Sequence, residues 1–313
     1  MLCEAAVSPY TLHELTAVSR SITDKYKRRS GRGERLVVEP VEAAVYAVVR
    51  MPATFGAVYS ALYHTLECVP LPEKCSLLDV GAGTGAGAFA ADSLITLSEV
   101  TCLEREPAMR RLGQDFTSRS SGALQNAEWI PSDLTNGIVQ RGDIVLSSYV
   151  LNELSDSCRE KVVQNLWEQT DHLLLIVEPG TPEAFSHLRR IRSQLQELGA
   201  CIAAPCVSQQ ECPLGQDDWC HFTVRVRRSK LHKQLKEADV PYEDEKFSYL
   251  AAVRNPVSVK GARILRHPQI AKGNIRLNVC EGSRTEQVVV TRKEKDRFKT
   301  ARKAECGDLL PEA

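Results

Sequence analysis

The spacing of apolar and polar residues divides the chain into three parts. Residues 8 to about 70 place apolar side chains at helical intervals, most clearly in 40–49 and 55–68. From Ser76 onward, short apolar runs alternate with helical stretches. The first pattern predicts a helical cap over residues 1–70. The alternation that follows is typical of βαβ units and predicts a parallel sheet.

Five apolar runs are predicted to form the parallel strands of that sheet. They cover residues 76–80, 99–103, 127–130, 143–147 and 171–177. Helices are predicted from about Cys158 and from Pro182 to Leu198. We therefore expect an α/β fold with a doubly wound, mostly parallel, Rossmann-like sheet over residues 71–200.

The regular pattern weakens after Gly199. Short strand-like runs are found at residues 222–226, 257–259, 262–265, 274–279 and 287–290. We expect some of them to extend the sheet and the others to form a small, strand-rich and cysteine-containing module within residues 201–313.

A glycine loop follows the first predicted strand. The residues Gly81, Gly83 and Gly85 form a G-A-G-T-G motif, in which glycine allows a tight turn and close approach of a ligand to the backbone. The dinucleotide fingerprint G-x-G-x-x-G requires a third glycine at a spacing that this loop lacks. The loop therefore favours S-adenosylmethionine over a redox dinucleotide.

Acidic residues at three successive strand ends strengthen this interpretation. Asp79 precedes the loop, and Glu104 ends the second strand, where an acid binds ribose hydroxyls in nucleotide folds. Asp133 follows the third strand and is the expected acceptor for an adenine amino group. Together with the three glycines, these acids are the predicted cofactor-binding residues.

The segment after the fourth strand holds the candidate catalytic residues. Tyr149, Asn152 and Glu153 lie where a methyltransferase presents residues to its acceptor, but the segment lacks the N-P-P-Y pattern that positions an exocyclic base amine. An equally weighted alternative makes Asn152 the cap of a helix.

Three cysteines lie close together after residue 200. Cys206, Cys212 and Cys220 are more consistent with a metal site than with disulfides, because the N-terminal residues show no secretion signal. Cys280, at the end of a predicted strand, is the candidate fourth ligand. Four thiolates suit an iron–sulfur cluster or a structural zinc, and His221 is a less favoured nitrogen ligand for zinc.

Charge is distributed unevenly, although the net charge is zero. Residues 221–303 carry 21 Lys and Arg against 9 Asp and Glu, which predicts a surface that binds polyanions. The residues expected to contact RNA phosphates are Arg225, Arg227, Arg228, Lys230, Lys233 and Lys236. Because the chain has no run of eighteen apolar residues, we expect no membrane span.

Several motifs together resemble one family. They are M-P-A-T at Met51, the glycine loop, V-E-P-G-T-P at Val177, C-P-L-G-Q-D-D-W-C-H-F at Cys212, P-Y-E-D-E-K-F-S-Y-L at Pro241 and A-R-I-L-R-H-P-Q-I-A-K-G at Ala262. The chain resembles the methyltransferase-like small-ribosomal-subunit assembly family, which includes mitochondrial assembly factors and shorter bacterial relatives.

The resemblance implies a class I methyltransferase fold, a methyl-donor pocket and a [4Fe–4S] cluster on Cys206, Cys212, Cys220 and Cys280. It also implies association with the small ribosomal subunit and its rRNA. Length favours the bacterial branch and the cytoplasm, with the mitochondrial matrix as the alternative. Two functions are therefore expected: an rRNA methyltransferase, or a non-catalytic assembly factor that retains the cofactor pocket. A radical enzyme is disfavoured, because the compact C-x3-C-x2-C motif is missing.

Overall fold

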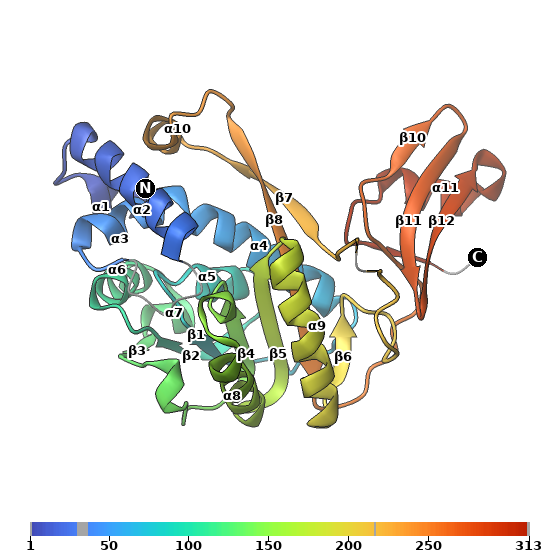
Figure 1. Ribbon diagram of the computed structural model, residues 1–313, viewed down its shortest axis with the longest axis horizontal. Helices are drawn as coiled ribbons and strands as arrows, with labels where there is room; N and C mark the ends of the chain where they lie inside the picture. The colour runs from blue at the N-terminus through green and yellow to red at the C-terminus, as the bar shows by residue number, and fades with distance from the viewer. Residues whose placement is uncertain (1, 30–36, 216, 312–313) are drawn as a thin grey trace.

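The computed structural model describes residues 2–29, 37–215 and 217–311, and its largest element is an eight-stranded sheet (Figure 1). The strands follow the order β3-β2-β1-β4-β5-β8-β6, and β7 pairs with β8. They are β1 (Cys75–Val80), β2 (Leu97–Leu103), β3 (Glu128–Ile130), β4 (Gly142–Ser148), β5 (Thr170–Pro179), β6 (Cys201–Ala204), β7 (Phe222–Arg227) and β8 (Tyr242–Val253).

Strand direction confirms the predicted doubly wound fold. The strands β1 to β5 run parallel, whereas β8 is antiparallel to β5, β6 and β7. The strand order reverses between β1 and β4, and open sheets of this kind bind ligands at the carboxyl ends of the strands beside such a reversal. The fold therefore places a binding crevice at the end of β1.

Helices cover both faces of this sheet. They are α4 (Met51–Leu66), α5 (Ala86–Asp92), α6 (Pro107–Ser118), α7 (Gly122–Gln125), α8 (Asp156–Glu168) and α9 (Pro182–Glu197). Successive strand residues point to opposite faces, so Leu77 packs in the cluster that contains α4 and α5, while Leu78 packs in the cluster that contains α8 and α9. This three-layer core holds the strand ends in fixed positions.

The predicted N-terminal cap is helical. It contains α1 (Leu2–Val7), α2 (Leu12–Arg29) and α3 (Pro40–Val49), and α10 (Lys230–Lys236) packs against α2 and α3. Among the described residues, no single helix has the length and apolar character needed to cross a membrane, and α3 and α4 meet those criteria only as a pair bent by 51°.

A second, antiparallel sheet forms a separate lobe near the C-terminus (Figure 1). Its strands are β9 (Ala262–Ile264), β10 (Gln269–Ala271), β11 (Asn274–Glu281), β12 (Arg284–Thr291) and β13 (Leu309–Leu310), and α11 (Lys295–Lys303) packs against β11 and β12. The predicted module of residues 201–313 is thus divided between the two sheets, because β6, β7 and β8 belong to the first. The strand predicted at residues 257–259 is wrong, since this segment has no regular structure.

Candidate functional site

The glycine loop forms a strained turn that only glycine fits. Gly81 and Gly83 have φ values of 72° and 60°, in the left-handed region. A Cβ atom at Gly81 would lie 2.3 Å from Cγ2 of Val150, so a side chain is excluded by contact as well as by conformation. The loop therefore brings bare backbone to the carboxyl end of β1.

A cavity of about 450 Å³ opens at this point. Its wall includes Gly81, Gly83, Glu104 and Asp133, which follow three different strands of the sheet. The volume lies within the range of about 300–1,000 Å³ that is usual for small-molecule sites. We call this space the cofactor cavity.

Glu104 is the best-fixed acid of the cofactor cavity. Its Oε2 accepts a hydrogen bond of 2.8 Å from the Gly83 amide, and its Oε1 accepts one of 2.7 Å from the Glu106 amide. Burial raises the pKa of the carboxyl group, although these two amide donors oppose the shift. A carboxylate held by the loop that it faces is well placed to receive ribose hydroxyls.

The other predicted cofactor residues have different positions. Asp133 lines the cavity, and hydrogen bonds of 2.7 and 3.0 Å from the Thr135 hydroxyl and amide lower its pKa. Asp79 is fully buried behind the loop, where it accepts a 2.9 Å hydrogen bond from the Ala88 amide. Gly85 is the N-cap of α5 and lies against Trp129. Neither Asp79 nor Gly85 is part of the cavity wall, and both support the loop from behind.

The segment after β4 also reaches the cofactor cavity. Tyr149 has a φ of 60°, and its hydroxyl donates a 2.9 Å hydrogen bond to Glu245. Glu153 lines the cavity, and burial raises its pKa to about 7. The alternative role of Asn152 as a helix cap is wrong, because Ser155 is the N-cap of α8. The Asn152 backbone instead donates a 3.2 Å hydrogen bond to Glu178.

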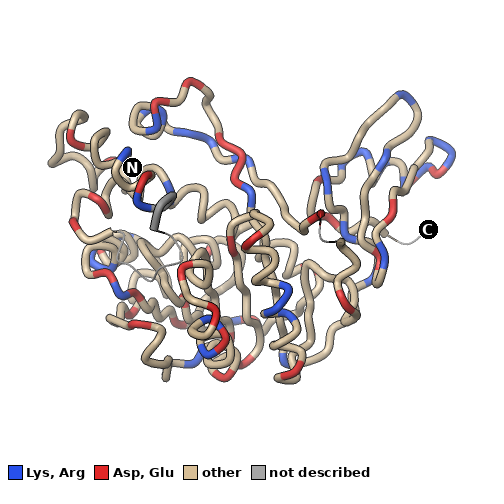
Figure 2. Tube along the Cα trace, in the orientation of Figure 1, with Lys and Arg blue, Asp and Glu red and all other residues tan. Residues whose placement is uncertain are grey.

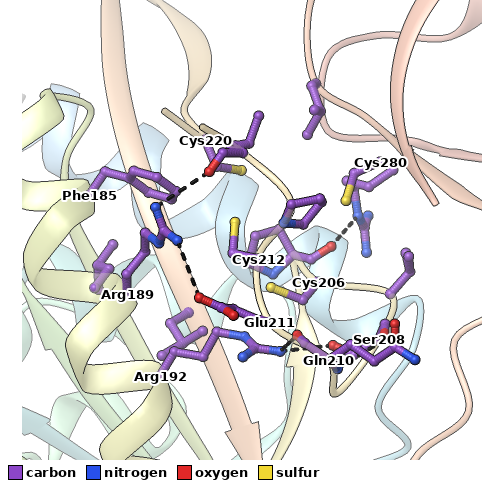
Figure 3. Close-up of a pocket in the computed structure, with 18 of the residues that line it drawn as sticks. Phe185, Arg189, Arg192, Cys206, Ser208, Gln210, Glu211, Cys212, Cys220 and Cys280 are labelled. Carbon is purple, nitrogen blue, oxygen red and sulfur yellow. Dashed lines mark hydrogen bonds and ion pairs between the residues drawn. The ribbon is translucent and has the colours of Figure 1, made fainter. Parts of the chain in front are cut away.

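The four predicted metal ligands line a separate, much smaller cavity (Figure 3). Cys206, Cys212 and Cys220 come from the loop between β6 and β7, and Cys280 comes from β11 of the second sheet. Residues separated by up to 74 positions are thus brought together at the junction of the two sheets. We call this space the cysteine cavity.

The cysteine cavity is not shaped for a single ion. Among the described residues, no group of three or more His, Cys, Asp or Glu side chains is placed to hold one metal ion. A structural zinc would need its thiolates about 2.3 Å from one central point. The cavity volume is about 50 Å³, whereas about 10–15 Å³ of such space is enough for a water molecule. The space that the four thiols help to line is therefore larger than a single water molecule.

Buried thiols and two arginines determine the electrostatics of the cysteine cavity. Burial and the neighbouring thiols raise the pKa of Cys220 well above its usual range and that of Cys280 to about 12. Arg192 and Arg263 oppose these shifts at Cys206 and Cys280. The Nε of Arg192 is buried and has no hydrogen-bond partner within the described chain. Two cations therefore face a set of thiols that would become anionic on ligation.

Hydrogen bonds hold the loop between β6 and β7, which we call the cysteine loop, from several sides. The Gln209 side chain pairs with both the amide and the carbonyl of Ile202 in β6, at 2.8 and 2.7 Å. Arg192 of α9 donates to the carbonyls of Ser208 and Gln210. Arg192 and Arg263 were not among the predicted site residues. For Arg263, the one signal in the sequence is a charged residue within the predicted apolar strand Ala262-Arg263-Ile264-Leu265.

The predicted RNA contacts lie on α10 and on the arm formed by β7 and the first half of β8, where basic residues of β7 face acidic residues of β8 (Figure 2). Arg225 forms a bidentate pair with Asp244 and lies over the Tyr242 ring, and Arg228 pairs with Glu243. Arg227 and Lys230 are exposed and form no ion pair with another described residue. Lys233 is half-buried, and Lys236 lines a cavity between α10, α2 and α3. The arm is therefore less cationic than its basic residues alone suggest.

Comparison with known proteins finds a human relative and several similar solved structures. The human mitochondrial ribosome assembly protein METTL17 is 27% identical over 289 residues, which cover 85% of this chain and 62% of the human protein. The chain thus spans about three fifths of that relative. Among solved structures, magnesium protoporphyrin IX methyltransferase from Synechocystis matches with 14% identity, a TM-score of 0.43, and coverage of 76% of this chain and 100% of that one. The YcgJ protein of Bacillus subtilis matches with 14% identity, a TM-score of 0.41, and coverage of 63% and 98%.

A family model gives the broadest match. The model described as mitochondrial small ribosomal subunit Rsm22 matches residues 40–311, which include the glycine loop and the four predicted ligand cysteines. The chain belongs to the Rsm22 family.

Proposed function

We propose that this protein is an S-adenosylmethionine-binding assembly factor of the small ribosomal subunit, which contacts rRNA and carries a [4Fe–4S] cluster. One observation supports it best: a nucleotide-type cavity and a four-cysteine cavity occur together in a chain of the Rsm22 family. The human relative is named as a ribosome assembly protein, which favours the same partner here.

The cofactor cavity supports S-adenosylmethionine as its ligand. Gly81 and Gly83 present backbone without side chains, Glu104 suits the ribose hydroxyls and Asp133 suits the adenine amino group. When bound, this cofactor supplies an activated methyl group. The cavity residues named above would bind and orient it.

The cysteine cavity supports a cluster as its bound group, with a structural zinc as the alternative. Cys206, Cys212, Cys220 and Cys280 would be its ligands, because all four line one cavity and such clusters are held by four cysteine thiolates. Arg192 and Arg263 would offset the negative charge of the thiolates. Since Cys280 belongs to the other sheet, the bound group would tie the second sheet to the first, as folding-coupled metal sites do.

The subcellular location would be that of the ribosome whose assembly the protein assists. Both the family description and the human relative are mitochondrial, which favours the mitochondrial matrix, the alternative given above. The cytoplasmic, bacterial-type location stays a prediction.

Methyl transfer to rRNA is a second candidate function. It is favoured by Glu153, a carboxyl group at the cofactor cavity with a pKa raised to about 7, near the optimum for a general base.

A binding experiment tests the proposed function. Isothermal titration with S-adenosylhomocysteine should show one site per chain, and Glu104→Gln should weaken binding roughly 10- to 100-fold, the effect of losing a charged hydrogen-bond acceptor. The protein should also co-sediment with immature small subunits. Absence of S-adenosylhomocysteine binding by the wild-type protein would contradict the proposal.

A further inference from the structure

A second cavity adjoins the cofactor cavity. It has a volume of about 240 Å³ and lies between α2, α3, α10 and the segment after β4. Tyr46, Tyr149 and Glu153 line both cavities, so the two spaces meet at these side chains. A group held in the second cavity would therefore lie next to the cofactor cavity.

The lining of this cavity combines cations, an amide and aromatic rings. Arg50, Lys236 and Asn152 contribute the polar groups, and Tyr46 and Tyr149 contribute the rings. Arg50 is held by Glu245, with Nη2 and Oε1 3.3 Å apart, and its guanidinium lies 6.0 Å from the centre of the Tyr149 ring. Because the Tyr149 hydroxyl already donates to Glu245, this residue offers its ring to a ligand more than its oxygen.

These features fit an unpaired nucleobase. Aromatic side chains stack on bases, amides read their edges, and cations bind the adjoining phosphates. The cavity is smaller than the cofactor cavity, which suits a single base better than a second cofactor. Enzymes that modify bases in RNA or DNA take the base out of its stack into such a pocket.

We propose that the second cavity is the acceptor site, and that it holds an unpaired RNA base with an N–H group directed at Glu153. This inference rests on the proposed binding of S-adenosylmethionine and rRNA. In the reaction, the base nitrogen takes the methyl group from the sulfonium as the sulfur–carbon bond breaks, and the Glu153 carboxylate accepts the proton of that nitrogen. The products are the methylated base, S-adenosylhomocysteine and protonated Glu153.

The surroundings of Glu153 are consistent with a proton acceptor. Its carboxylate forms no hydrogen bond with another described residue, so it is available to a ligand. Burial raises its pKa, nearby acids raise it further, and Arg105 lowers it. The charged and titratable groups that face it or share its two cavities are Glu104, Arg105, Glu106, Asp133, Cys158, Glu178, Tyr46, Tyr149, Arg50 and Lys236.

The first test needs no methyl transfer. Transcripts of the small-subunit rRNA that contain 4-thiouridine are irradiated with the cofactor-free, full-length protein, and crosslinked peptides are identified by mass spectrometry. We expect crosslinks to the segment with Tyr149 and Asn152, reduced several-fold by Lys236→Ala and by competing unpaired RNA but not by duplex RNA. Crosslinks that fall only on other segments would overturn the proposal.

The second test measures incorporation of labelled methyl groups into small subunits from cells that lack the protein. Glu153→Gln should lower the maximal rate about 100-fold or more and leave the affinity for S-adenosylhomocysteine within about twofold. Lys236→Ala should instead raise the concentration of subunits needed for half-maximal rate. The matched control is Glu99→Gln, at an exposed position of β2 outside both cavities, and it should change neither value.

The remaining outcomes separate the two proposals. A Glu153→Gln protein that transfers methyl groups at the wild-type rate would overturn the role of Glu153. A wild-type protein that binds S-adenosylhomocysteine but methylates no subunit would overturn the acceptor site and leave the assembly factor. A wild-type protein that binds no S-adenosylhomocysteine would overturn the proposed function itself.

Discussion

Cys280 and Arg263 are directly opposite each other on the neighbouring strands β11 and β9 of the second sheet. Both side chains line the cysteine cavity. The Arg263 guanidinium also donates to the carbonyl of Pro205, at 3.1 Å, in the loop that carries the other three thiols. One cross-strand pair thus supplies both the fourth thiol and a fixed cation to the junction between the sheets.

Arg263 should be essential for this junction. Only 1% of its surface is exposed, and it also donates a 2.7 Å hydrogen bond to the Gly307 carbonyl. Arg263→Met should lower the free energy of unfolding by about 2–5 kcal/mol, because buried carbonyls lose their donor. Urea unfolding measures this change. Arg276→Met, at an exposed position of β11, is the control and should change stability by less than about 0.5 kcal/mol.

The glycine loop allows a test with an internal control. Gly81 and Gly122 both have positive φ values, 72° and 64°, but a Cβ at Gly122 would meet nothing within 4 Å. Gly122→Ala should therefore cost only the backbone strain, about 1–2 kcal/mol. Gly81→Ala adds the contact with Val150 and should cost more, and it should also weaken S-adenosylhomocysteine binding. Thermal unfolding and calorimetry measure the two effects, and equal costs for the two variants would contradict the close approach.

Asp79 should make stability depend on pH. Burial raises its folded-state pKa to about 7, above the value of about 3.9 expected when unfolded. The folded state therefore binds more protons in this interval, and the contribution of Asp79 to stability falls as the pH rises from about 4 to 7. Asp79→Asn should remove that part of the slope. Unfolding free energies of both proteins at pH 5, 6, 7 and 8 measure it, and parallel pH profiles would show that the Asp79 pKa is not raised.

RNA binding should depend most on the cations that lack acidic partners. Arg227→Ala or Lys230→Ala should weaken binding to single-stranded rRNA and reduce the salt dependence, each by about 0.7 in the slope of log K against log salt. Arg228→Ala should have a smaller effect, because Glu243 already pairs with that side chain. Binding titrations at several salt concentrations measure the slopes, and equal losses for Arg227→Ala and Arg228→Ala would contradict this distinction.

Local patterns predicted the first half of the fold well. The runs at residues 76–80 and 99–103 lie within β1 and β2, and the helix predicted from Pro182 to Leu198 matches α9 closely. Buried parallel strands give continuous apolar runs, and for that reason they are readable from sequence. By contrast, β8 begins with charged residues such as Glu243 and Asp244, which pair with β7 in the arm. The first half of β8 therefore has no apolar run, and its strand conformation depends on pairing with β7 and β5.

The site was predictable in part, for a similar reason. Strand-end residues such as Glu104 and Asp133 follow from the local pattern, since parallel strands end at one edge. Convergence of Cys280 with the cysteine loop depends on docking of the second sheet, which no local spacing specifies. Arg50 and Lys236 belong to elements that meet only in the folded chain. The second cavity, proposed above as the acceptor site, was therefore not predictable from the sequence.

Three cysteines of the loop between β6 and β7, together with Cys280 of β11, are proposed to bind one iron–sulfur cluster. The most direct measurement is the iron, sulfide and zinc content of anaerobically purified protein, for the wild type, Cys280→Ser and the control Cys3→Ser in α1. We predict about four iron and about four sulfide ions per chain in the wild type and in Cys3→Ser, and a marked loss in Cys280→Ser. Zinc in place of iron, or an iron content that Cys280→Ser leaves unchanged, would contradict the claim.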